Sequence, residues 1–291
     1  YYLSAPMGGA AIGRITTAGE TTFYPAAPGT VGGLGGDSIT SGPDGALWYL
    51  PECTCIGRMT TDGSSTVYPL PSGDFAESIT GGPNGALWFT FMNYAGNGVG
   101  EITTSGQVTV FSDPSFGAHG GPSYRQLRDI TVGPDGALWL VNFDESGQGQ
   151  CSIESITTAG AVSTHPAPFC PSAFVSGPDR ELWLAAGAEP LVSTGSSTPT
   201  LAAMDTSGAV TATYALDGPW NVMHMRVGPD GALWFEDNGG PGFIGRIAPD
   251  GTLTRYTSPY LDDPVGLTVG PDGALWFADL GNDTIGQITP P

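Results

Sequence analysis

The sequence is organised around a short segment, Gly-Pro-Asp-Gly-Ala-Leu-Trp at residues 42–48, which returns with small changes along the whole chain. Proline sets φ for the second position of a turn, aspartate or asparagine suits the third, and glycine adopts the left-handed conformation that closes a hairpin. Each copy lies between two short apolar runs, so it predicts a strand, a turn and a second strand. The copies begin at Gly42, Gly82, Gly133, Gly177, Gly228 and Gly270.

The last glycine of this turn is expected to have a positive φ, because a side chain at that position is unfavourable in the left-handed region. In one copy Arg180 stands there instead, so we expect that turn to be strained or differently built. The other copies carry Gly45, Gly85, Gly136, Gly231 and Gly273.

A second recurring segment, Ile-Gly-Arg-Ile-Thr-Thr at residues 12–17, follows the tryptophan segment in each unit and leads through a tight turn into a last short strand. Each unit therefore has four short antiparallel strands. We call them A (before the Gly-Pro-Asp-Gly turn), B (with the tryptophan), C (with the second segment) and D (ending near Tyr or Phe). Successive turns lie 40 to 51 residues apart, a period typical of propeller blades.

The pattern predicts an all-β, seven-bladed β-propeller of four-stranded antiparallel blades, forming one domain over residues 1–291. B and C strands occur seven times if residues 1–4 are counted, but A and D strands only six times. We therefore expect the chain to start inside the first blade, with N-terminal strands missing upstream of Tyr1. The alternatives are a six-bladed ring with a spare N-terminal half-blade, and two strands donated by another molecule.

Composition favours a rigid extracellular β protein, since 46 glycines and 26 prolines supply turns and 10% aromatic residues supply the core. With 28 acidic and 8 basic residues the net charge is −20, which disfavours binding to nucleic acid or to anionic membranes. Because the sequence has no apolar run of about 18 residues, we expect no membrane insertion.

Four cysteines lie at the same predicted end of the strands, in connections between B and C strands or between blades. We expect Cys151 to pair with Cys170, and Cys53 with Cys55 in a small strained ring. A metal site at Cys53 and Cys55 would need two more soft ligands nearby, and that loop has no further Cys or His. Disulfides imply export, so we expect an extracellular or cell-surface location.

Chain length varies in the B-to-C and D-to-A connections and hardly at all in the other turns. These connections emerge on one face of the predicted propeller, which we call the variable-loop face. Variable loops on a rigid scaffold are where binding usually occurs, so we expect a small molecule, a glycan or a protein to bind there. Assembly with other subunits is a further possibility. The longest insertions lie at 91–98, 112–127, 142–152, 186–200 and 237–243.

Polar residues recur at the predicted rim of that face, either five residues before the turn glycine or three residues after the tryptophan. The acidic ones could hold a divalent cation or a cationic ligand, with the arginine as a counter-charge. The alternative is that they cap backbone donors at strand ends. They are Asp37, Glu77, Arg128, Asp237 and Asp279.

Two further residues are candidates for ligand contact. Trp220 is the one tryptophan outside the repeat, so it either stacks on a sugar or aromatic ring or covers an apolar rim. His224 lies between two methionines in an A strand, where a histidine is either a satisfied core residue or an acid–base group.

The combined motif, Ile-Thr-x-Gly-Pro-Asp-Gly-Ala-Leu-Trp-Phe-Thr followed by Ile-Gly-Arg-Ile-Thr and a strand ending in Tyr-Pro or Phe, resembles the virginiamycin B lyase (streptogramin lyase) family. The resemblance covers essentially the whole chain and implies a seven-bladed propeller. It also implies opening of a macrocyclic ester antibiotic by elimination, with Mg²⁺, acidic residues at B-strand ends, and histidines at the start of the last two A strands.

At the implied histidine positions this sequence has Met223 and Val265, whereas Asp237 and Asp279 stand at the acidic positions. His224 is one residue out of register, which in a regular strand places it on the other face. We therefore expect a secreted or surface-displayed binding or structural module that lacks the family's elimination chemistry. The alternative is a metal-assisted lyase acting on an extracellular ester or carbohydrate, with His224 recruited as the base.

Overall fold

The computed structural model describes residues 3–4, 10–26, 34–51, 53–71, 73–117, 125–144, 151–186, 200–216, 221–237 and 242–291. Within these ranges the secondary structure is β, apart from the short 3₁₀ helix η1 (Pro114–Phe116). The chain divides into two compact units, the first comprising Tyr1–Val132, Gly136–Gln148 and Ser152–His165, and the second Gly133–Asp135, Gly149–Cys151 and Pro166–Pro291. Each unit is described by itself.

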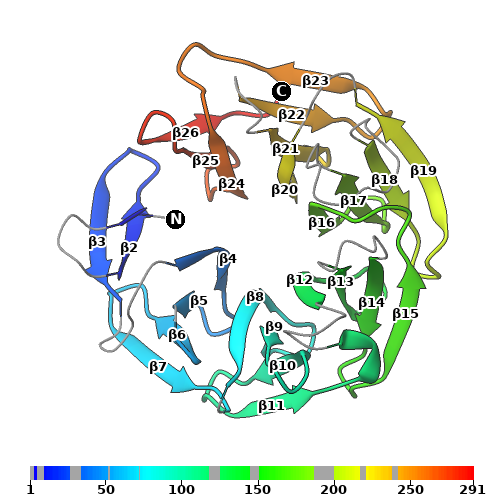
Figure 1. Ribbon diagram of the computed structural model, residues 1–291. Helices are drawn as coiled ribbons and strands as arrows, with labels where there is room; N and C mark the ends of the chain where they lie inside the picture. Colours follow the sequence, from blue (N-terminus) through cyan, green and yellow to red (C-terminus); the bar gives the residue numbers. More distant parts are fainter. Residues whose placement is uncertain are drawn as a thin grey trace. The chain divides into compact units, whose positions relative to one another are not determined.

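The first unit contains four antiparallel sheets whose strands follow one another in chain order (Figure 1). The first sheet has three strands, β1 (Leu3–Ser4), β2 (Ala10–Ile15) and β3 (Thr21–Pro25). The others have four strands each: β4 (Leu34–Ser41), β5 (Leu47–Pro51), β6 (Cys55–Met59) and β7 (Ser65–Pro69); β8 (Phe75–Gly81), β9 (Leu87–Met92), β10 (Gly98–Ile102) and β11 (Val108–Phe111); β12 (Arg125–Val132), β13 (Leu138–Asp144), β14 (Ser152–Ile156) and β15 (Val162–Pro166).

The second unit contains three antiparallel sheets, and the last of them has three strands. In this unit β20 packs beside both β16 and β24. The strands are β16 (Ala173–Ser176), β17 (Leu182–Ala186), β18 (Thr200–Met204) and β19 (Val210–Ala215); β20 (Val222–Val227), β21 (Leu233–Asp237), β22 (Phe243–Ile247) and β23 (Leu253–Tyr256); β24 (Pro264–Val269), β25 (Leu275–Asp279) and β26 (Thr284–Ile288).

The predicted fold class, an all-β propeller of four-stranded antiparallel blades, is confirmed. The strand assignment also agrees with the prediction, because the described residues hold seven B and seven C strands but six A and six D strands. The number of seven complete blades is not confirmed, since the sheets β1–β3 and β24–β26 have three strands each. The blade number, the missing upstream strands and the single domain over 1–291 stay predictions.

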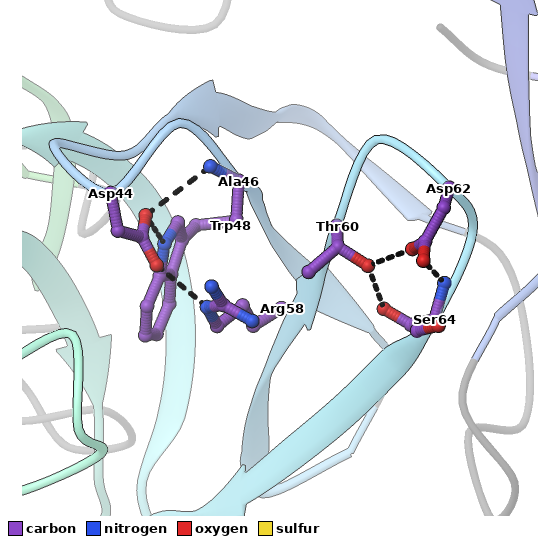
Figure 2. Close-up of polar contacts among 7 residues, drawn as sticks. All are labelled: Asp44, Ala46, Trp48, Arg58, Thr60, Asp62 and Ser64. Carbon is purple, nitrogen blue, oxygen red and sulfur yellow. Dashed lines mark hydrogen bonds and ion pairs between the residues drawn. The ribbon is translucent and has the colours of Figure 1, made fainter.

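The aspartate of the repeated turn explains why the motif has its spacing. In the turn between β4 and β5, Asp44 Oδ1 accepts hydrogen bonds from Trp48 Nε1 at 3.1 Å and from the Ala46 N–H at 3.3 Å (Figure 2). Its other oxygen accepts from Arg58 Nε at 2.7 Å, which lies on β6. One carboxylate therefore ties the turn, the B-strand tryptophan and the C-strand arginine together.

The turn between the C and D strands of the same sheet has its own polar link. Thr60 donates its hydroxyl to Asp62 and also to the Ser64 carbonyl oxygen at 3.0 Å, and the Ser64 N–H donates to Asp62 Oδ1 at 3.2 Å (Figure 2). These hydrogen bonds satisfy the polar groups of the tight turn within the turn itself. That explains why its length hardly changes along the chain.

The repeat tryptophans form the core by stacking on an aromatic side chain of the D strand in the same sheet. Each stack closes within one sheet, but the buried apolar clusters join neighbouring sheets, as where Trp48 and Ile56 pack in one cluster with Phe89. The ring centroids are 5.3 to 5.5 Å apart in four sheets, and 4.8 Å apart where histidine replaces the usual aromatic residue. The pairs are Trp48–Tyr68, Trp88–Phe111, Trp183–Tyr214, Trp234–Tyr256 and Trp139–His165.

The five turn glycines predicted to have positive φ do so, with values of 70° to 79°. Arg180 adopts the same conformation, φ 67°, and Asp179 Oδ1 still accepts from the Glu181 N–H and from Trp183 Nε1. The Arg180 turn is therefore strained rather than differently built.

Replacing Arg180 by glycine is expected to stabilise the protein by about 0.5–1 kcal/mol, because a non-glycine residue in the left-handed region costs roughly 1–2 kcal/mol and glycine returns part of that through unfolded-state entropy. Urea unfolding of Arg180→Gly measures the change. Gly231→Ala in the equivalent turn, where a Cβ meets no atom within 4 Å, is the matched control and should destabilise. A destabilised Arg180→Gly variant would contradict the assignment of strain.

The turn aspartates also make stability depend on pH. Burial by itself raises the pKa of Asp230, but hydrogen bonds from Trp234 and Arg246 outweigh it and leave the pKa below its ordinary value of 3.8. The pKa of Asp44 is lowered in the same way. Because folding favours the ionised carboxyl, the stabilisation is fully present above pH 3.8 and is lost as the pH falls through the lower folded value.

We therefore expect the urea midpoint to be level from pH 7 to pH 5 and to fall below pH 4. Asp230→Asn keeps an acceptor for Trp234 but cannot titrate, so its midpoint should fall less steeply over the same range. Equal slopes for the two proteins below pH 4 would show that Asp230 does not couple folding to protonation.

Both predicted disulfides are present, Cys53–Cys55 and Cys151–Cys170. Among the described residues, no helix has the length and apolar character needed to cross a membrane. The two disulfides agree with the sequence-based expectation of an exported protein.

Candidate functional site

Three of the predicted rim residues, Asp37, Glu77 and Arg128, lie on A strands, whereas Asp237 and Asp279 end B strands. Most A strands are interrupted by a bulge. In β4, β8, β12, β20 and β24 the pairing with the B strand shifts register partway along. A bulge sets two residues against one and re-aims their side chains. Strict alternation of side chains between the two faces therefore does not hold here.

In β20 this bulge changes the place expected for His224. The pairing skips from Val222 to Met225, so Met223 and His224 both oppose Glu236 of β21. His224 Nδ1 forms a hydrogen bond with Glu236 Oε1. The prediction that His224 turns to the other face rested on regular alternation, and the bulge removes that basis.

Glu236 is the centre of this group. Its side chain is fully buried, and besides His224 it accepts the backbone N–H of Gly266 at 2.9 Å and of Leu267 at 3.2 Å. Gly266 has φ 70° at the bulge of β24, a conformation that glycine adopts without strain. One buried carboxylate thus joins β20, β21 and β24 and fixes the ring of His224 through Nδ1.

Sequence reasoning missed Glu236, although a signal was present. It is the one charged residue at the second position after a repeat tryptophan, where the other copies are apolar or threonine. A buried charge among apolar equivalents marks a partner elsewhere in the fold. The equivalent residues are Leu50, Thr90, Val141, Ala185 and Ala278.

Asp279 acts as a cap for the neighbouring backbone. Its buried carboxylate accepts the N–H groups of Asp262 at 3.1 Å and Asp263 at 3.0 Å, together with Asn282 Nδ2 at 3.1 Å. Burial by itself raises the pKa of Asp279, but these donors outweigh it and lower the pKa below 3.8. Its structure therefore matches the capping alternative.

The Mg²⁺ that the family resemblance implies would need several oxygen ligands in near-octahedral geometry. Among the residues that the structure describes, no group of three or more His, Cys, Asp or Glu side chains is placed to hold a metal. Asp279 is committed to N–H donors, and the one buried oxygen of Asp263 without a hydrogen-bond partner supplies a single ligand. The described residues therefore do not fit an Mg²⁺ site.

Met223 and Val265, at the implied histidine positions, are both partly buried. Asp237 is buried at the end of β21, and its backbone pairs with Val222 and Phe243. In this part of the second unit, His224 and Glu236 are in direct contact, whereas Asp279 is held by backbone donors.

In the first unit, Glu77 and Arg128 are brought together through Gln126. Gln126 Nε2 donates to Glu77 Oε2 at 2.8 Å, and Gln126 Oε1 accepts from Arg128 Nε at 2.7 Å and also from Nη2. The Arg128 guanidinium lies 4.3 Å over the ring of Phe143. The predicted counter-charge is thus held in a fixed plane, which suits recognition of a planar or anionic ligand group.

The side-chain positions of two predicted residues, Asp37 and Trp220, are not described. Asp37 belongs to β4, and its backbone lies in the segment where the pairing with β5 shifts register. Trp220 lies outside the described residues.

A family model described as the Virginiamycin B lyase family matches residues 5–189 and 171–291. A search of curated proteins found no match to the chain. The resemblance inferred from the sequence motifs is therefore confirmed over nearly the whole chain.

Solved structures of lyases are similar to the chain throughout its length. A selenomethionine-substituted virginiamycin B lyase from Staphylococcus aureus is 26% identical, with a TM-score of 0.75, over 100% of this chain and 91% of that one. A streptogramin B lyase structure is 25% identical, with a TM-score of 0.73, over 98% and 88%. A catalytically inactive variant of the S. aureus enzyme with quinupristin is 24% identical, with a TM-score of 0.75, over 100% and 99%, and shows the shared fold alone.

Proposed function

The chain belongs to the virginiamycin B lyase family, and on that premise we propose that it is a secreted or surface-displayed propeller that binds a ligand without the family's elimination reaction. We propose a small molecule as the ligand. A glycan or a protein is the alternative ligand for the variable-loop face. The observation that carries the proposal is the pair Met223 and Val265, since neither side chain accepts a proton from carbon.

Three features support a binding role. Both disulfides lie in connections of variable length, where they hold loops in place. In the first unit, Arg128 stands in a fixed plane over Phe143. Within the second unit taken by itself, Met223 and Val265 are partly exposed apolar groups beside the His224–Glu236 pair. Apolar contact with a few oriented polar groups is typical of a small-molecule site.

The His224–Glu236 pair favours a second candidate, a lyase acting on an extracellular ester or carbohydrate. A carboxylate at Nδ1 sets the tautomer and the orientation of a histidine ring, as in acid–base catalysis. In this candidate His224 removes the proton in place of the histidines that the family resemblance implies. The binding proposal and this candidate differ in whether bound ligand is converted.

Titration calorimetry with a streptogramin B antibiotic tests the binding proposal. We expect saturable binding by the wild-type chain, and an affinity about tenfold lower for His224→Ala, because one hydrogen bond to a charged or polar group is lost. His165→Phe, which keeps a ring against Trp139 on an outer strand, is the matched control and should bind as the wild type does. Absence of heat at all concentrations would contradict a small-molecule site of this class.

A further inference from the structure

The two disulfides differ in how much of the chain they constrain. Cys53 and Cys55 are separated by 2 positions in the sequence, whereas Cys151 and Cys170 are separated by 19. The unfolded-state entropy that a cross-link removes grows with the length of the loop it closes. The fold therefore gains little stability from Cys53–Cys55, and more from Cys151–Cys170.

Exposure does not distinguish the two bonds. Cys55 and Cys151 are each 9% exposed, and their partners Cys53 and Cys170 are both partly buried. A difference in reactivity between the bonds must therefore come from ring size and from the backbone around each one.

The backbone at Cys53–Cys55 is unusual for this chain. Strands β5 and β6 have five residues each, but within the described part of the chain their pairing ends at Tyr49 opposite Gly57, after three pairs. Strands β21 and β22 have the same lengths and form five pairs. At the disulfide end, Pro51 pairs outward with β4 and Cys55 pairs outward with β7, and among the described residues no pair joins these two residues.

The ring therefore holds the end of the β5–β6 ladder open. A short ring leaves few backbone conformations, because loops of this size deviate strongly from flexible-chain behaviour. The Cys53 N–H also donates to the Pro51 carbonyl oxygen at 2.6 Å, next to the ring. Breaking the bond releases this constraint without removing a long-range cross-link.

We propose that Cys53–Cys55 is a thiol–disulfide exchange site for soluble dithiols, and that its reduction lets β5 and β6 pair over more of their length. A dithiol thiolate attacks Cys53, the less buried sulfur, forming a mixed disulfide, and Cys55 leaves as a thiolate that takes up a proton. The second thiol of the reagent then displaces Cys53. The products are two cysteine thiols and the oxidised reagent, so two electrons pass from the dithiol to the protein.

The site lies in the connection between a B and a C strand, so its redox state would alter a loop of the predicted binding face. The inference does not rest on the proposed function, because it uses only ring size and strand pairing. A negative result in the ligand-binding test would therefore leave this inference unaffected.

Graded reduction with dithiothreitol tests the proposal directly. Thiols released at each concentration are alkylated, and the Cys53–Cys55 and Cys151–Cys170 peptides are quantified by mass spectrometry. We expect Cys53–Cys55 to be half-reduced at a dithiothreitol concentration at least about tenfold lower than the concentration that half-reduces Cys151–Cys170. Half-reduction of both bonds at the same concentration, or of Cys151–Cys170 first, would overturn the proposal.

Paired serine variants separate an exchange site from a structural bond. Cys53→Ser with Cys55→Ser should stay folded with a smaller fall in Tm than Cys151→Ser with Cys170→Ser. Hydrogen exchange over residues 50–57 should slow in the first variant and stay unchanged in the second. An unfolded first variant, or faster exchange over that segment, would show that the bond supports the strands and would overturn the inference.

Discussion

Replacing Trp234 by alanine is expected to lower the free energy of unfolding by about 3–5 kcal/mol, the range for removing a large buried aromatic side chain. The Trp234 side chain is fully buried, its Nε1 donates to Asp230 Oδ1 at 2.9 Å, and its ring stacks on Tyr256 at 5.3 Å. The substitution therefore removes core volume and leaves a turn carboxylate without one of its donors.

Urea unfolding followed by circular dichroism measures this loss. Tyr260→Ala is the matched control, because Tyr260 is 83% exposed and its loss should change stability by no more than about 0.5 kcal/mol. A loss below about 1 kcal/mol for Trp234→Ala would mean that the repeat tryptophan is not the core of its sheet.

Restoring the two missing histidines is expected to give the second large effect. In a variant with Met223→His and Val265→His, the rate of streptogramin B ring opening should rise by about 10²- to 10⁴-fold over the wild-type background, the usual contribution of a positioned general base. Both positions lie on A strands of adjacent sheets in the second unit, where β20 packs beside β24.

The ring-opened product is measured by mass spectrometry with magnesium in the buffer. Met223→Gln with Val265→Gln is the matched control, because glutamine is polar but cannot act as a base near neutral pH. If the histidine variant folds and binds the antibiotic but converts it no faster than this control, the missing histidines are not the reason for the absent reaction.

The repeat made the local structure predictable from the sequence. The turn glycines, the left-handed Arg180 and the Cys53–Cys55 disulfide follow from residue chemistry within a few positions of the chain, and the strand order follows from repetition. The Cys151–Cys170 disulfide follows from the placement of both residues at the same predicted end of the strands. The number of blades does not follow in the same way, because it depends on how the incomplete sheets β1–β3 and β24–β26 are completed.

The site was less predictable because its geometry depends on register. A bulge of one residue in β20 decides that His224 meets Glu236, and no local propensity in the sequence reveals that shift. Asp279 could be read as a metal ligand or as a cap, and its role depends on backbone N–H groups that the fold brings to it. Long-range contacts of this kind require the assembled strands.

The central claim is that this family member binds a ligand but does not carry out the elimination. Incubating the purified wild-type chain with a streptogramin B antibiotic and magnesium, and following the ring-opened product by mass spectrometry, tests it most directly. We expect the antibiotic ring to be opened no faster than in protein-free buffer, although the antibiotic binds saturably in the calorimeter. Enzyme-like turnover that disappears in His224→Ala would contradict it and would assign the base to His224.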